Sequence, residues 1–230
     1  MRYLIVCGGK IDKEFGLNEI KTDGIDAIIA ADSGMDFLYE NGVTPDIIVG
    51  DFDSTTTNAL EYFERKGQTE IRRLNPIKDD TDTEYAIRLA IREGARSIVL
   101  LGATGSRIDH VLGNISLLGI GLESGTDISI IDTNNRIRMA DKPITIEKSA
   151  QYGRFVSLIA VTDDNEVSLR GFKYPVTDYS FDRFTSLGIS NEIVDDHALI
   201  DIHRGKFIII ESKDLSLIHI SEPTRLRCIS

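Results

Sequence analysis

The sequence predicts a two-part α/β protein, with an open parallel α/β sheet followed by a smaller antiparallel β-sandwich. Over the first 135 or so residues, short β-branched runs alternate with longer helical patterns, which is typical of a parallel α/β sheet. Most of these runs lack polar alternation, as expected when helices cover both faces of the sheet. After about Asn135 the runs become short and alternating and are separated by turn-rich segments, which indicates antiparallel strands.

The predicted elements follow from this patterning in chain order. In the first part we expect strands at residues 3–7, 27–30, 47–49, 70–72, 97–101 and 128–131, and helices at 34–41, 57–66, 82–93 and 108–122. In the second part we expect strands at 155–161, 166–169, 198–202 and 207–211. Helix 82–93 carries its own start signal, because Thr81 can cap it and Glu84 can complete a capping box, and Gly94 follows as a C-terminal cap.

These patterns divide the chain into three stretches. Residues 1–135 are predicted to form the α/β domain, and residues 136–214 the smaller β-sandwich domain. Residues 215–230 continue neither strand nor helix periodicity, so we interpret them as a non-native tail.

The composition excludes several classes of protein. The 230 residues are 41% hydrophobic and 27% charged, which is ordinary for a soluble globular protein. The net charge is −11, so the chain lacks the excess of basic residues that broad nucleic-acid binding needs. Such a chain can still bind a polyphosphate when divalent cations screen its carboxylates. No apolar run approaches the roughly 20 residues of a membrane span, and the two cysteines lie at opposite ends of the chain. We therefore expect a cytoplasmic protein that binds neither nucleic acid nor membranes.

Aspartates recur where the predicted parallel strands end. They are Asp32 after the second strand, Asp51 and Asp53 after the third, Asp79, Asp80 and Asp82 after the fourth, and Asp109 after the fifth. Open α/β sheets bind ligands beyond the carboxyl ends of their strands, so these side chains should converge on one edge. Any single aspartate is equally well explained as a turn or cap residue, but convergent carboxylates repel one another unless a cation shares the site. Such oxygen ligands suit Mg²⁺.

The segment Asp51-Phe52-Asp53 has two carboxylates two residues apart. In an extended segment, residues two apart point to the same side, so both carboxylates would face the site and Phe52 the core. Gly50 would allow the backbone to turn sharply at the strand end.

A loop of small residues, Gly102-Ala103-Thr104-Gly105, connects the fifth predicted strand to a helix. Its backbone N–H groups and the helix terminus favour phosphate, although the Gly-Lys-Ser/Thr ending of a Walker A loop is missing. Lys78 and Arg107 add the fixed positive charge that phosphoryl transfer requires. His110 and Cys7 are interpreted as structural residues.

Taken together, these motifs resemble the thiamine pyrophosphokinase family. The matching segments occur in order over about residues 3–211 and are 31–34, 50–54, 78–82, 102–110 and 188–192. The resemblance implies ATP and thiamine as substrates, AMP and thiamine diphosphate as products, and a homodimer with active sites near the subunit interface. It also implies that residues 1–135 are the catalytic, ATP-binding domain and that residues 136–214 bind thiamine and form the dimer.

The resemblance also implies roles for individual residues. Magnesium and phosphate handling fall to Asp51, Asp53 and Asp82, with Asp79, Arg107 and Asp109 as their partners around ATP. The nucleotide-binding set is completed by Asp32, Ser33, Lys78, Gly102, Thr104 and Gly105. Ser190 and Asn191 belong to the thiamine pocket, contributed by the second subunit.

Two features depart from the family pattern. Ser106 stands where many relatives have a second Gly, which narrows the loop without removing its N–H groups. The chain has no Trp to stack on the thiamine cation, which leaves four aromatic candidates: Tyr174, Tyr179, Phe181 and Phe184.

The mechanism we expect is in-line attack by the thiamine hydroxyl on the β-phosphorus of ATP, with Asp79 as a candidate base. Three alternatives stay open at this point. They are a pyrophosphokinase acting on a pterin alcohol, a non-catalytic nucleotide or thiamine sensor, and a metal-dependent phosphohydrolase.

Overall fold

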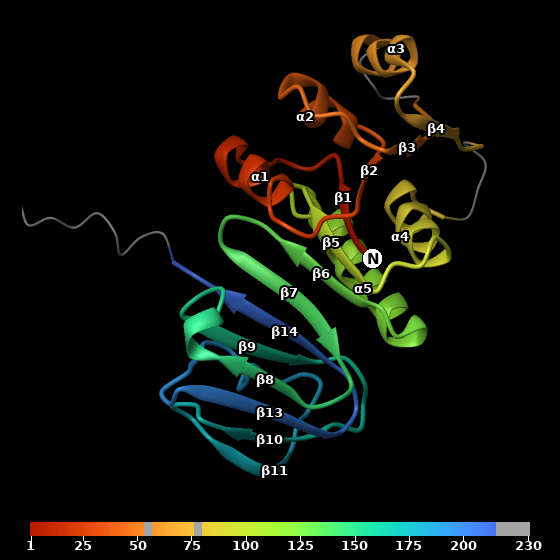
Figure 1. Cartoon of the computed structure of the whole chain (residues 1–230). Helices are drawn as coiled ribbons and strands as arrows, with labels where there is room; N and C mark the ends of the chain where they lie inside the picture. The colour runs from red at the N-terminus through yellow and green to blue at the C-terminus, as the bar shows by residue number, and fades with distance from the viewer. Residues whose placement is uncertain (53–56, 76–79, 215–230) are drawn as a thin grey trace, which may run out of the picture.

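The computed structural model describes residues 1–52, 57–75 and 80–214, and it contains an α/β part and a β-sandwich part that share one sheet. In Figure 1 the helices gather around one end of this sheet, and the second, smaller sheet lies against the other end. The two-part fold predicted from the sequence is confirmed.

The shared sheet has ten strands in the order β12-β9-β14-β7-β6-β5-β1-β2-β3-β4, and its parallel section runs from β6 to β4. The parallel strands are β1 (Arg2–Val6), β2 (Ala27–Ala31), β3 (Ile47–Gly50), β4 (Glu70–Arg73), β5 (Ser97–Leu101) and β6 (Asp127–Ile131). The helices are α1 (Lys13–Ile20), α2 (Gly34–Glu40), α3 (Thr57–Lys66), α4 (Asp82–Arg92) and α5 (Ile108–Ser124).

Helices cover both faces of the parallel section. On one face, α4 and α5 bury Ile87 and Leu118 against Ile5 and Ile29 of the sheet. On the other face, α2 and α3 bury side chains such as Phe63 against the neighbouring strand positions. Burial on both faces explains why these strands are apolar throughout rather than alternating.

The antiparallel strands continue the same sheet beyond β6. This extension consists of β7 (Asn135–Ala140), β14 (Phe207–Ser212), β9 (Phe155–Ala160) and the edge strand β12 (Asn191–Glu192). A four-stranded sheet packs against the extension and consists of β11 (Val176–Ser180), β10 (Glu166–Arg170), β13 (His197–Arg204) and β8 (Ile144–Glu147). A short 3-10 helix, η1 (Lys148–Ala150), follows β8 in the chain. The core between the two sheets includes Leu158, Leu169, Ile200 and Phe207. The predicted boundary near residue 135 falls at the start of β7, inside the continuous sheet, and the division into domains stays a prediction.

Most predicted elements lie within about two residues of the observed ones, whereas α1, β7, β8, β11 and β12 were missed. Thr81 caps α4 as predicted, because its hydroxyl accepts a hydrogen bond from Glu84 N at 3.2 Å. The carboxylate of Glu84 instead accepts from Arg88, one turn further along the helix, at 2.7 Å. Gly94 follows the last turn in the left-handed conformation, with φ +89°.

Candidate active site

A pocket of about 1040 Å³ lies beyond the carboxyl ends of the parallel strands, where the sequence predicts the site. Its lining comes from the segments that follow β1, β2, β5 and β6 and from the first turns of α4 and α5. These segments meet because parallel strands place all their carboxyl ends at one edge of the sheet.

Three carboxylates, those of Asp32, Asp51 and Asp82, come together beside the pocket. Each offers an oxygen atom within 4.8 Å of the other two, and all three residues are half-buried. Asp32 and Asp51 directly follow the neighbouring strands β2 and β3, and Asp82 is the first residue of α4. Converging oxygen ligands at this spacing fit a hard divalent cation such as Mg²⁺.

This group contains one residue that the predicted metal set did not include. Asp32 was assigned to nucleotide binding, but it lies with Asp51 and Asp82. Asp53 lies outside the described residues, as do Lys78 and Asp79. Their predicted roles stay predictions.

The extended conformation predicted for the Asp51–Asp53 segment is wrong at Phe52. This residue has φ +62°, in the left-handed region, so the simple alternation of side chains does not apply. The Phe52 ring is half-buried against the core on the α2–α3 face, and the Arg73 guanidinium lies over it at 5.4 Å. The chain therefore turns at Phe52 itself, two residues after Gly50.

The loop that follows β5 packs backbone against backbone on the loop that follows β1. Gly9 N donates to Gly102 O at 2.9 Å, and a Cβ added at Gly9 would lie 2.3 Å from that oxygen. Gly102 has φ +71°, and a Cβ there would lie 2.5 Å from Cys7 O. Only glycine fits both positions, so the two loops pack closely against each other where they line the pocket.

Arg107 and Asp109 form an ion pair at the rim of the pocket, at the start of α5. Arg107 Nη2 lies 2.5 Å from Asp109 Oδ2 and Arg107 Nε lies 3.2 Å from Asp109 Oδ1, while both side chains are about two-thirds exposed. The hydrogen bonds from Arg107 lower the pKa of the Asp109 carboxyl below its usual value, and Asp109 raises the pKa of the guanidinium. Both groups therefore stay charged at neutral pH, and the pair remains accessible to an incoming phosphate.

Several lining residues were missed by the sequence analysis. Gly8, Gly9 and Lys10 follow β1, Asn114 comes from α5, and Asp132 follows β6. Asn114 Nδ2 donates to Ala103 O at 2.7 Å and so holds the glycine-rich loop. The signal for Asp132 was present, because it stands directly after a predicted strand like the other aspartates.

The two residues interpreted as structural also line the pocket. Cys7 is fully buried at the end of β1, and burial raises the pKa of its thiol to about 11, so it remains a neutral thiol. His110 is exposed in the first turn of α5, which differs from the satisfied structural role that the sequence suggested.

Ser190 and Asn191 lie away from this pocket within one chain. They are at β12, the edge strand of the shared sheet, with four strands between it and β5. At about 4.8 Å between neighbouring strands, the distance from β12 to β5 is roughly 24 Å. Asn191 is buried and exchanges hydrogen bonds with the backbone of Tyr174, accepting from Tyr174 N at 3.1 Å and donating to Tyr174 O at 2.9 Å. The structure therefore does not bring the predicted thiamine residues to the nucleotide pocket of the same chain.

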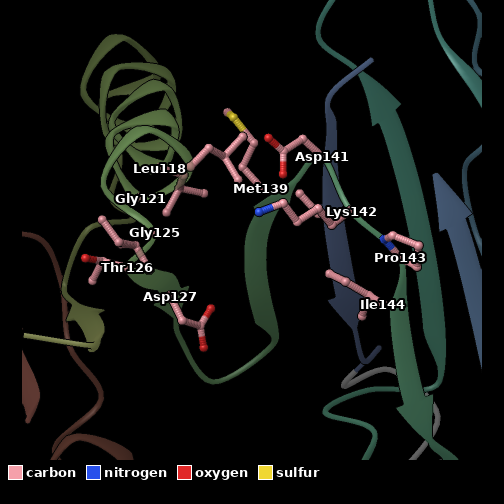
Figure 2. Close-up of a pocket in the computed structure, with 13 residues that line it drawn as sticks. Leu118, Gly121, Gly125, Thr126, Asp127, Met139, Asp141, Lys142, Pro143 and Ile144 are labelled. Atoms are coloured by element: carbon pink, nitrogen blue, oxygen red, sulfur yellow. The ribbon is translucent and has the colours of Figure 1, made fainter. Parts of the chain in front are cut away.

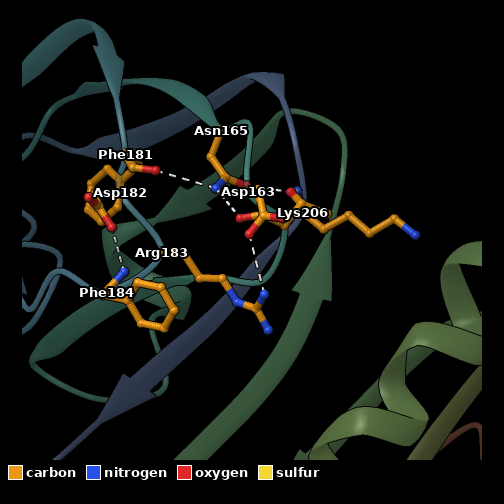
Figure 3. A network of polar contacts seen from close by, with 8 residues as sticks. Asp163, Asn165, Phe181, Asp182, Arg183, Phe184 and Lys206 are labelled. Atoms are coloured by element: carbon orange, nitrogen blue, oxygen red, sulfur yellow. Dashed lines mark hydrogen bonds and ion pairs between the residues drawn. The ribbon is translucent and has the colours of Figure 1, made fainter.

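The aromatic candidates for thiamine stacking differ in exposure. Phe181 is 4% exposed and packs edge-on against Phe207, so it belongs to the core, whereas Phe184 is 92% exposed. Figure 3 shows how the turn around Phe184 is held, with an ion pair between Arg183 and Asp163 at 3.3 Å and a hydrogen bond from Phe184 N to Asp182 Oδ1 at 2.7 Å. Burial removes Phe181 from the candidates and leaves Tyr174, Tyr179 and Phe184.

A second, smaller pocket of about 210 Å³ lies at the opposite edge of the sheet. Figure 2 shows it between the C-terminal end of α5 and the β7–β8 connection, with Asp127 and Lys142 among its lining residues. Asp127 begins β6, so this pocket lies at the amino ends of the parallel strands, away from the carboxylate group.

The fold and the larger pocket together define a class: a doubly wound α/β protein whose strand-end carboxylates and glycine-rich loop suit a metal-bound polyphosphate. The sequence comparisons agree with this class and narrow it. Residues 21–130 match the thiamin pyrophosphokinase catalytic domain, and residues 143–207 match the thiamin pyrophosphokinase vitamin B1 binding domain. The chain belongs to the thiamin pyrophosphokinase family.

Individual relatives show the extent of the likeness. The chain is 34% identical over 188 residues to the thiamine pyrophosphokinase of Bacillus subtilis, covering 81% of this chain and 87% of the relative. The crystal structure of the Bacillus subtilis enzyme superposes with a TM-score of 0.84 at 32% identity, over 94% of this chain and 100% of that chain. The Geobacillus thermodenitrificans structure gives a TM-score of 0.82 at 30% identity, over 94% and 99%. None of the helices in the described part of the chain combines the length and apolarity of a membrane span.

Proposed function

We propose that this member of the thiamin pyrophosphokinase family transfers the pyrophosphoryl group of ATP to the hydroxyl of thiamine, with the polyphosphate bound in the larger pocket. The observation that carries the proposal is the meeting of the Asp32, Asp51 and Asp82 carboxylates with the Gly102–Ser106 loop at one edge of the sheet. The products are AMP and thiamine diphosphate.

The carboxylate group fits a magnesium ion, which would be held by Asp32, Asp51 and Asp82, with Asp53 as the further ligand that the family resemblance implies. A magnesium ion bound there would supply charge neutralisation for the phosphate oxygens. Without a cation, three acidic oxygens this close would repel one another. The choice of Mg²⁺ over other hard divalent cations rests on the family resemblance.

The chain's own residues bind and orient the polyphosphate. The close packing of Gly9 on Gly102 fixes the position of the glycine-rich loop. The Arg107 guanidinium fork donates from Nε and Nη2 to Asp109 and keeps its remaining N–H groups for phosphate oxygens. Asp109 holds that fork in place before the substrate arrives. Lys78 and Asp79 keep the roles of cation and candidate base that the sequence predicts. Positioning and charge stabilisation dominate such transfers, so the identity of the base is secondary.

The thiamine site is completed by a second copy of the chain in this proposal. Ser190 and Asn191 lie roughly 24 Å from β5 across the sheet, too far to reach a thiamine molecule at the same chain's carboxylates. Exposed apolar side chains gather in the same region of the sandwich, including Phe184, Leu187 and Ile189, with exposed fractions of 92%, 72% and 49%. A homodimer would cover these side chains and bring Ser190 of one chain to the nucleotide pocket of the other. The cytoplasmic location predicted from composition stays a prediction.

Subunit complementation tests this arrangement. Asp51→Asn impairs the nucleotide half-site, and Ser190→Trp fills the thiamine half-site with a bulky ring at an exposed position. Each variant alone should form little thiamine diphosphate. After subunit exchange, the mixture should recover roughly a quarter of the wild-type activity, because half of the dimers are mixed and each mixed dimer has one intact site. No recovery from a mixture proven to contain mixed dimers would contradict the shared site.

A further inference from the structure

The carboxylate of Asp132, directly after β6, is surrounded by hydrogen-bond donors. Oδ2 accepts from Thr104 Oγ1 at 2.9 Å, and Oδ1 accepts from Asn134 N and Asn135 N, both at 2.8 Å. Asn135 Nδ2 adds a further hydrogen bond at 3.0 Å. These bonds link the β6–β7 turn to the glycine-rich loop after β5 and fix the position of the carboxylate.

The direction of the Thr104–Asp132 bond determines what Thr104 can offer to a ligand. An ionised carboxylate only accepts hydrogen bonds, and a hydroxyl has one hydrogen to donate. Thr104 therefore donates its hydrogen to Asp132 and keeps only lone pairs for other contacts. Phosphate oxygens are also acceptors, so the Thr104 hydroxyl is mismatched to phosphate, in contrast to the N–H groups of the same loop.

The turn that carries Asp132 is held from the β-sandwich side. The Tyr152 hydroxyl donates to Asp132 O, and Lys213 N donates to Asn134 O at 2.9 Å. Tyr152 N in turn donates at 2.9 Å to Oε2 of Glu211, which is fully buried. Because the turn is anchored on this side, the Asp132 carboxylate cannot easily rotate away and release the Thr104 hydroxyl as a donor.

Thr104 is half-buried and lines the larger pocket together with Asp132. We propose that Thr104 and Asp132 form an acceptor subsite: the Thr104 oxygen accepts a hydrogen bond from an amino or hydroxyl group of a substrate, and Asp132 is the positioning residue that fixes its direction. The inference rests on the proposed function, because it takes the pocket to be the substrate site. ATP offers its adenine amino group and two ribose hydroxyls as donors, and thiamine offers its pyrimidine amino group and its hydroxyethyl hydroxyl.

The test combines variants with substrate analogues in binding titrations. Dissociation constants are measured for Mg-ATP, thiamine and inorganic pyrophosphate with the wild type, Thr104→Val and Thr104→Ser. Loss of one accepted hydrogen bond should weaken the binding of one substrate about tenfold in Thr104→Val, whereas Thr104→Ser should retain wild-type affinity. Pyrophosphate, which has no such donor at its chelated oxygens, should bind both variants equally well.

Analogues that each lack one donor then identify the partner group. The set comprises the purine nucleotide without the amino group, the 2′-deoxy and 3′-deoxy nucleotides, and the thiamine analogues without the amino or the hydroxyl group. The analogue that lacks the partner of Thr104 should bind wild type and Thr104→Val with equal affinity. Asp132→Ala should lower the discrimination between that analogue and the parent substrate, because the hydroxyl can then rotate.

Three outcomes would overturn the inference. They are weakened pyrophosphate binding in Thr104→Val, unchanged affinity for both substrates, or a loss that persists equally with every analogue. Melting temperatures identify variants that fail to fold, and Thr104→Ala, which also lacks the hydroxyl, then replaces Thr104→Val in the comparison. Failure of the proposed function would instead appear as absence of thiamine-dependent AMP from the wild type, a result that is independent of these affinities.

Discussion

Arg107 and Asp109 form a two-point ion pair at the rim of the pocket, with both side chains about two-thirds exposed. Two residues apart at the start of α5, they orient the guanidinium fork beside the glycine-rich loop before any substrate is bound. An exposed pair of this kind adds little to stability, so its value lies in positioning.

Arg107→Lys should therefore impair catalysis without impairing folding. Lys keeps the positive charge but lacks the planar N–H donors of the guanidinium. The loss of charge-assisted hydrogen bonds to phosphate should lower kcat/KM for Mg-ATP by roughly 10- to 100-fold. Steady-state kinetics at varied Mg-ATP would measure this effect. Arg65→Lys, at an exposed ion pair on α3, is the matched control and should be neutral. An equal loss in both variants would refute a specific role for Arg107.

Asp51→Asn should abolish the stabilisation of the folded protein by Mg²⁺. Asn has the shape of Asp but lacks the negative charge that a divalent cation requires of its ligands at this group. The rise in melting temperature on adding Mg²⁺ should be lost, because a ligand stabilises only the state that binds it. Asp23→Asn, at an exposed position before β2, should keep the full magnesium response. An unchanged magnesium response in Asp51→Asn would remove Asp51 from the metal site.

Glu211→Ala should strongly destabilise the junction between the two parts of the fold. Glu211 is fully buried on β14 and pairs with Arg136 at 2.7 Å and Arg138 at 2.9 Å on β7. Desolvation already lowers the pKa of Arg138, and loss of Glu211 would leave this guanidinium half-buried without its counter-ion. Urea unfolding should show a loss of about 3–5 kcal/mol. Glu61→Ala, at the exposed pair with Arg65 on α3, should cost about 1 kcal/mol or less. Similar losses for the two variants would contradict the role assigned to burial.

Gly9→Ala should displace the glycine-rich loop and weaken Mg-ATP binding. The added Cβ would lie 2.3 Å from Gly102 O and 2.6 Å from Thr104 O, so one of the two loops must shift. We expect at least a tenfold increase in KM for ATP, since displacement of a positioning group by about 1 Å has effects of this order or larger. Gly119→Ala is the control, because its Cβ would make only an ordinary 3.8 Å contact with Met139 and should stabilise α5 by up to about 1 kcal/mol. Normal ATP kinetics in Gly9→Ala would show that ATP binding does not depend on the close packing of these two loops.

The parallel sheet and the location of the pocket were predictable because they depend on local patterns. Apolar runs identify strands that are buried on both faces. Because parallel strands place their carboxyl ends at one edge of the sheet, Asp32, Asp51 and Asp82 could be assigned to that edge without any knowledge of distances. Even α1 had a local signal, because Asp12 caps it by accepting from Phe15 N at 2.9 Å.

The remaining features depend on contacts that a local pattern does not contain. In β7, Arg136 and Arg138 alternate with apolar residues and look like an exposed strand face, but their partner Glu211 lies more than 70 residues away in the chain. The left-handed conformation of Phe52 has no signal in the sequence, because bulky residues rarely adopt it. For Ser190 and Asn191, the sequence signal was resemblance alone, and their distance from the pocket becomes visible only in the strand order.

The most direct test of the account is AMP release from Mg-ATP by the wild-type chain with thiamine present, absent, or replaced by a hydroxymethylpterin. The account predicts AMP only with thiamine, in a one-to-one ratio with thiamine diphosphate. AMP formed only with the pterin would keep the pocket and contradict the substrate. Free phosphate without an acceptor, or no product from folded protein, would contradict pyrophosphoryl transfer itself.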